Sequence, residues 1–250
     1  MMKRAIVHIF ILLVSFASSA SAQERKVENR PYTDLRPFHF GVVVGTHLQD
    51  VELMNVGPQT ITHEDGTVVQ SNIVADQDRY DAGFTVGVLG ELRLNKHFQF
   101  RVAPAMYFGN RHLSFLNLNE QDAAGKPLEQ RQDLKTAYIS TALNLIFAAP
   151  RFNNHRPYIM AGINPMINLS GKGEDFIRLK RYDIFAEIGL GCDFYLPFFK
   201  LRPELKFMFS LVNTLDINRE RSISNKNMLP YILSVKESRT KMIALSFYFE

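Results

Sequence analysis

Hydrophobic and polar residues alternate with a period of two along much of this chain. In the first such stretch, Phe38, Phe40, Val42 and Val44 share one face, while His39 lies on the other. Alternation of this kind is typical of a β-strand with two different faces. Each stretch has about ten residues, which is the length of a membrane-spanning strand. Eight stretches follow this pattern: 38–47, 84–94, 98–111, 136–147, 158–167, 183–194, 201–211 and 242–249.

The connections between these stretches alternate in length. Short links occupy 95–97, 148–155 and 196–200, and long ones occupy 49–80, 116–134, 169–181 and 213–239. Outer-membrane barrels have short periplasmic turns and long extracellular loops. The pattern therefore predicts an all-β fold, an eight-stranded antiparallel transmembrane up-and-down β-barrel. After the N-terminal segment no apolar run approaches about 18 residues, so we expect no transmembrane helix.

Alternation alone does not separate a lipid-facing barrel from a water-soluble one, which places its apolar face inside. The apolar faces here carry no charged residue, as contact with lipid requires. Aromatic residues gather at strand ends, at Phe98, Phe147, Phe194 and Phe249, as in interfacial girdles. We therefore predict a location in the outer membrane, with outer-membrane lipid and lipopolysaccharide as partners. A soluble periplasmic barrel is the alternative.

The N-terminus resembles a secretory signal. Lys3 and Arg4 precede an apolar run from Ile6 to Phe16, and small residues end at Ala22. This order is typical of a cleaved signal peptide, and the run is short for a membrane anchor. The sequence thus predicts a signal peptide at 1–22, a periplasmic tail at 23–35 and the barrel at 36–250.

Composition excludes several classes of protein. The predicted signal contains two basic residues and no acidic one, so the net charge falls from +4 to +2 after cleavage. So mild a charge, without a basic stripe, argues against a nucleic-acid partner. Cys192 is the single cysteine, so an intrachain disulfide is excluded.

The faces opposite the apolar ones carry charges of both signs on neighbouring strands. An eight-stranded barrel has an interior only wide enough for side chains, and buried charges must be paired. We therefore expect a network of ion pairs rather than a pore lining. Its predicted members are Glu91, Arg93, Arg101, Asp183, Glu187, Asp193, Arg202, Glu204 and Lys206.

Catalytic and metal-binding patterns are weak in this sequence. It contains no CxxC or HxxxH spacing for a metal and no GxSxG nucleophile motif. A carboxylate pair such as Glu187 and Glu204 would suit acid–base chemistry, but interior carboxylates opposite Arg and Lys are usually structural. We expect no enzymatic activity, no cofactor, no metal site and no small-molecule substrate.

One long segment resembles a known family. Residues 188–215 read IGLGCDFYLPFFKLRPELKFMFSLVNTL, Phe38–Gly41 follows the predicted tail, and the chain ends in Leu245–Glu250. These features resemble the PorT family of outer-membrane barrel proteins in Bacteroidota. The resemblance implies a role in the type IX secretion system, which exports proteins with a C-terminal sorting domain, and contacts with other proteins of that system. It implies no site residue. The alternative is a small outer-membrane barrel of the adhesion, solute-binding or lipid-binding kind, without a role in secretion.

Overall fold

The computed structural model describes residues 27–62, 68–170, 176–216 and 228–250. The predicted signal peptide at 1–22 and the first residues of the predicted tail lie outside these ranges. Nine hydrogen-bonded strands form one closed antiparallel sheet. Two of them, β4 (Ile73–Tyr80) and β5 (Ala82–Arg93), follow each other along the same partner strand and occupy one place in the ring.

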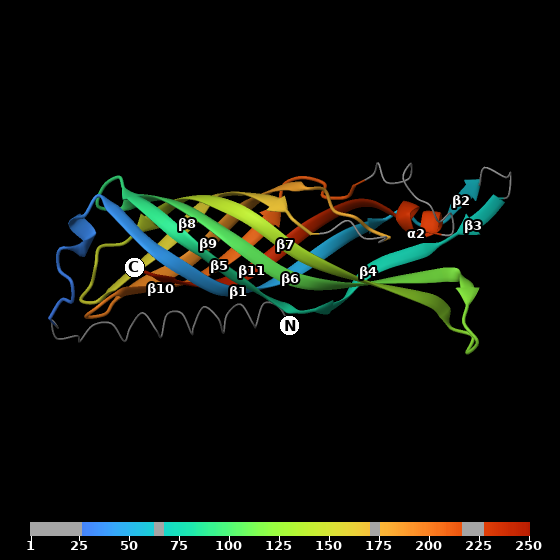
Figure 1. The fold of residues 1–250 in the computed structure, drawn as a ribbon, viewed down its shortest axis with the longest axis horizontal. Helices are drawn as coiled ribbons and strands as arrows, with labels where there is room; N and C mark the ends of the chain where they lie inside the picture. Colours follow the sequence, from blue (N-terminus) through green and yellow to red (C-terminus); the bar gives the residue numbers. More distant parts are fainter. Residues whose placement is uncertain (1–26, 63–67, 171–175, 217–227) are drawn as a thin grey trace, which may run out of the picture.

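The ring therefore has eight places, and the predicted eight-stranded up-and-down barrel is confirmed. Around the ring, β4/β5 is followed by β6 (Phe98–Gln121), β7 (Pro127–Ala148), β8 (His155–Asn168), β9 (Tyr182–Tyr195), β10 (Lys200–Ser210), β11 (Val235–Phe249) and β1 (Phe38–Asn55), which pairs with β5 to close it. Figure 1 shows an elongated barrel of tilted strands.

The two ends of the barrel differ. The 3-10 helix η1 (Thr33–Leu35) lies at the short-turn end. At the other end, the long-loop end, are the hairpin β2 (Gln59–Thr62) and β3 (Val68–Ser71) and the short helix α2 (Leu229–Leu233). In outer-membrane barrels the short turns face the periplasm. No helix among the described residues is long and apolar enough to cross a membrane.

An apolar belt surrounds the barrel at the short-turn end and extends through its middle. On β1 it runs from Phe38 to Leu48, and the next outward residue is Asp50. Ten residue steps of about 3.3 Å, tilted by about 40°, give a height of roughly 25 Å, the height of the apolar band in such barrels. Side chains in the belt are exposed, as at Phe40 with 74%, whereas Arg101 on the interior face is 0% exposed.

Above the belt, toward the long-loop end, the outward face becomes polar and the inward face becomes apolar. On β6, Phe108 points outward and is the last outward aromatic residue before Asn110 and His112, while Leu113 and Phe115 point inward and are buried. Where water replaces lipid outside the barrel, polar residues are stable on the outer face and apolar residues gather inside. The same backbone pattern thus continues with its two faces exchanged.

This exchange corrects three of the predicted loops. Much of 116–134 belongs to β6 and β7, and 49–80 contains the end of β1, the β2–β3 hairpin and β4. The predicted loop 213–239 contains α2 and the first residues of β11. The apolar outward face of each strand ends at the edge of the belt, so the predicted strands ended there. The hydrogen-bonded strands continue beyond it.

Candidate functional site

Five of the predicted interior charges form one connected network near the short-turn end. Arg101 pairs with Glu204 at 2.7 Å and with Glu91 at 3.2 Å. Arg202 pairs with the same Glu91 oxygen at 2.7 Å and with Asp193 at 2.6 Å. All five side chains are fully buried, so each charge is balanced by contact with its opposite rather than by water.

Two tyrosines complete this network. Tyr158 and Tyr248 each donate a hydroxyl hydrogen bond to Glu204, at 2.8 and 3.1 Å. The Arg101 guanidinium also lies 4.4 Å from the centre of the Tyr248 ring, within the range of a cation–π contact. Gly191 gives Tyr158 its room, because a Cβ there would lie 2.5 Å from the Tyr158 hydroxyl.

Lys206 and Glu187 join the network through Tyr248. The Lys206 ammonium lies 3.9 Å from the Glu187 carboxylate and donates to the Tyr248 hydroxyl at 3.3 Å. The same hydroxyl donates to Glu204. A chain of polar contacts therefore runs from the network around Arg101 and Glu204 toward the middle of the barrel.

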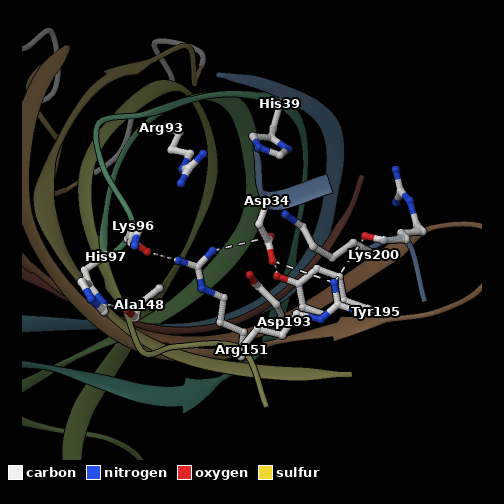
Figure 2. A network of polar contacts seen from close by, with 12 residues as sticks. Asp34, His39, Arg93, Lys96, His97, Ala148, Arg151, Asp193, Tyr195 and Lys200 are labelled. Carbon is white, nitrogen blue, oxygen red and sulfur yellow. Dashed lines mark hydrogen bonds and ion pairs between the residues drawn. The ribbon is translucent and has the colours of Figure 1, made fainter. Parts of the chain in front are cut away.

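The structure places two of the nine predicted residues apart from the network. Asp183 is buried nearer the long-loop end, where it accepts hydrogen bonds from the Ser210 hydroxyl and the Ile184 amide, both at 2.7 Å. Arg93 is half-buried and donates to the Asn95 carbonyl at 3.3 Å. The prediction is wrong for both residues. In the described parts of the chain Asp183 contacts hydrogen-bond donors rather than a basic group, and Arg93 is the last residue of β5, where an inward side chain reaches the rim. In Figure 2 no dashed line joins Arg93 to the other residues drawn.

Sequence reasoning missed a clamp that holds the N-terminal segment across the short-turn end. Asp34, in η1, accepts a hydrogen bond from Tyr195 at 2.6 Å. The guanidinium groups of Arg156 and Arg151 lie 3.6 and 3.9 Å from the same carboxylate. Figure 2 shows Asp34 above Asp193 and Tyr195, with the barrel behind. The described part of the predicted tail is therefore attached to the barrel rather than free.

Further contacts secure residues 27–36, which we call the strap. Arg151 donates to the carbonyl of Asn29, and Arg30 donates to the carbonyl of Glu250 at 2.9 Å. The Glu250 side chain in turn contacts His39 and lies 2.5 Å from the Lys200 ammonium. The sequence signal for these contacts was a basic residue in each of two predicted short turns, Arg151 in 148–155 and Lys200 in 196–200.

Side chains fill the interior above the network as well. A middle layer contains Tyr107, Phe185, Met208 and Met242. Above it Arg111 donates to Gln49 at 2.8 Å. The end of the interior next to the long loops is filled by an apolar cluster: Ile73, Ala75, Leu113, Phe115, Leu134, Ile177, Leu179, Leu215 and Val235. At every level of the described strands the interior is thus occupied by buried side chains.

The chemistry of this interior is that of a structural network. Its carboxylates contact guanidinium, ammonium or hydroxyl groups, and within the described ranges no three His, Cys, Asp or Glu residues gather into a metal site. Paired buried charges fix the geometry of neighbouring strands and are strongly destabilising when one partner is removed.

The chain is similar to several solved outer-membrane proteins and to one protein family. Neisserial surface protein A is 12% identical, with a TM-score of 0.40, and the match covers 85% of this chain and 98% of that protein. OprG from Pseudomonas aeruginosa is 12% identical, with a TM-score of 0.43 and coverage of 84% and 93%. Ail of Yersinia pestis is 11% identical, with a TM-score of 0.35 and coverage of 84% and 96%. No curated protein matches the chain. A family model described as "Outer membrane protein beta-barrel domain" matches residues 20–216, and the chain belongs to this family.

Proposed function

We propose that this protein is a closed, non-enzymatic barrel of the outer membrane that serves as a structural component of the type IX secretion system. The observation that carries the proposal is the filled interior. The Arg101–Glu204 pair crosses the lumen, and the strap covers the short-turn end. A barrel built in this way acts through its ends and its outer surface, where partner proteins and lipids can bind, rather than by conducting a solute.

The secretion role itself is supported by the resemblance of residues 188–215 and of both ends of the barrel domain to the PorT family. The periplasmic end offers a rigid surface for a partner, because the Asp34 clamp holds the strap there. On this proposal other secretion-system proteins bind at that end, and outer-membrane lipid surrounds the belt.

Deletion of the gene in its host tests the proposal. A secreted protease with a C-terminal sorting domain should accumulate in the periplasm and return to the medium when the wild-type gene is restored. Complementation with the Asp34→Ala variant asks whether the strap matters for export. Normal export in the deletion strain would rule out the secretion role. Only the assignment as an outer-membrane barrel would then remain.

The second candidate is a surface barrel that binds a partner or solute at its extracellular end. It is favoured by β6 and β7, which continue as a paired ribbon beyond the belt to Gln121 and Pro127. Truncating this ribbon should then abolish surface adhesion while export stays normal. Measurement in planar bilayers separates both candidates from a pore, since a filled interior should give no steady ion conductance.

A further inference from the structure

A niche of about 890 Å³ hollows the outer surface of the barrel across β5, β6, β7 and the residues that follow β8. Its floor is apolar and consists of Phe84, Phe108, Ala137 and Leu169. The Phe84 and Phe108 rings stack with their centres 4.8 Å apart and an angle of 22° between their planes. The floor belongs to the apolar belt, so a hydrocarbon chain is the neighbour that this surface meets in a membrane.

The niche lies where two strand ladders are interrupted. β5 pairs with β6 as far as Phe84 opposite Phe108, and β4 resumes the pairing only at Tyr80 opposite Arg111. On the other side, β8 ends at Asn168 while β7 continues. The wall therefore lacks the regular side-chain packing that covers the barrel elsewhere, and the hollow is built into the strand topology.

The upper rim of the niche is polar. Lys135 lines it and is exposed. In the described parts of the chain no carboxylate forms an ion pair with its ammonium; Asp81, which also lines the niche, and Asp133 contact His112 at 2.6 and 2.5 Å. Asn110 also lines the niche, but its side-chain oxygen is buried from solvent. The polar group that the rim offers to a ligand is thus the exposed Lys135 ammonium, directly above an apolar floor.

We infer that this niche binds one phosphorylated glycolipid of the outer leaflet, the lipid A part of lipopolysaccharide. An acyl chain lies on the Phe84–Phe108 floor, and a phosphate contacts Lys135. The niche faces the outer leaflet because the long-loop end is extracellular in such barrels. A free phosphate lacks the chain that the floor requires, and a phospholipid such as phosphatidylglycerol carries a singly charged phosphodiester, whereas a phosphomonoester of lipid A carries a charge of about −1.5 to −2 for Lys135. The inference does not depend on the secretion role.

Native mass spectrometry of the full chain in detergent, with purified lipid A as the probe, tests this assignment. The wild-type protein should retain one lipid A. Lys135→Ala should weaken retention about tenfold or more, the scale of a lost charge-assisted hydrogen bond. Ala137→Trp, which fills the floor, should abolish it. Lys241→Ala is the matched control, since Lys241 is also exposed, at the edge of the belt on β11, but pairs with Glu52 at 2.6 Å and lies outside the niche.

Lipid A without its phosphates should bind the wild-type protein as weakly as lipid A binds Lys135→Ala. Equal retention of lipid A by the wild-type protein and Lys135→Ala would overturn the inference, as would equal retention of phosphatidylglycerol and lipid A. Should Ala137→Trp fail to fold, the exposed Lys135→Ala variant still decides the matter.

Discussion

Arg101 on β6 and Glu204 on β10 form an ion pair of 2.7 Å across the barrel interior, although their strands are four places apart in an eight-membered ring. Strands in those positions lie on opposite sides of the barrel. Hydrogen bonds of the sheet connect each strand only to its neighbours, so this pair is one of the contacts that join opposite walls directly. It constrains the width of the barrel as well as neutralising two buried charges.

Removing one partner of this pair should destabilise the protein strongly. Arg101→Ala leaves Glu204 without its ion-pair partner and Glu91 with fewer, and we expect a loss of about 3–5 kcal/mol in the free energy of unfolding. Urea unfolding in lipid vesicles measures it. Arg131→Ala, which removes an exposed pair with Glu129, should cost less than about 1 kcal/mol. Similar losses in the two variants would show that the interior network contributes no special stability.

The height of the apolar belt can be checked with two arginine substitutions. Ile163 faces outward in the middle of the belt on β8, and Leu118 faces outward on β6 beyond it. Ile163→Arg should cost about 2–4 kcal/mol in vesicles, and Leu118→Arg about 0–1 kcal/mol, because only the first charge enters hydrocarbon. Equal costs would contradict the position of the belt.

Loosening the strap should be visible by hydrogen exchange. Asp34→Ala removes the acceptor of Tyr195 and the partner of Arg151 and Arg156, so the strap amides should exchange faster while those of β10 stay protected. Asp216→Ala, which removes an ion pair with Arg178 at the long-loop end, is the control. Unchanged exchange of the strap in Asp34→Ala would mean that other contacts hold it.

The outer face above the belt carries a pH-sensitive group. Hydrogen bonds to Asp81 and Asp133 raise the pKa of His112 above its ordinary value. Because the pKa is higher in the folded protein, this contribution to stability is complete below the unfolded value of about 6.5 and is lost as the pH rises through the folded value. NMR titration should show the raised pKa in the wild-type protein and a lower one in Asp81→Asn. The same pKa in Lys241→Ala is the expected control result, and an unchanged pKa in Asp81→Asn would refute the role of Asp81.

The niche, the clamp and the exchange of faces share one property. Each arises where a regular pattern ends: at the interruption between β4 and β5, at the short turns, or at the upper edge of the belt. Periodicity describes the interior of a pattern well. It carries little information about what side chains do at its boundaries, where they can reach water, turns or other segments.

The sequence by itself determined the eight places in the ring, their order and which face of each meets lipid, because period-two alternation follows from backbone geometry alone. It also predicted that interior charges would be paired, since buried charge without a partner is costly. Only the tertiary structure decided which charges meet. Arg101 and Glu204 are 103 positions apart, and their contact depends on strand register and closure of the ring. The strap likewise depends on three residues that converge on Asp34, namely Arg151 in the turn before β8, Arg156 in β8 and Tyr195 at the end of β9. No local pattern encodes this relation between distant segments.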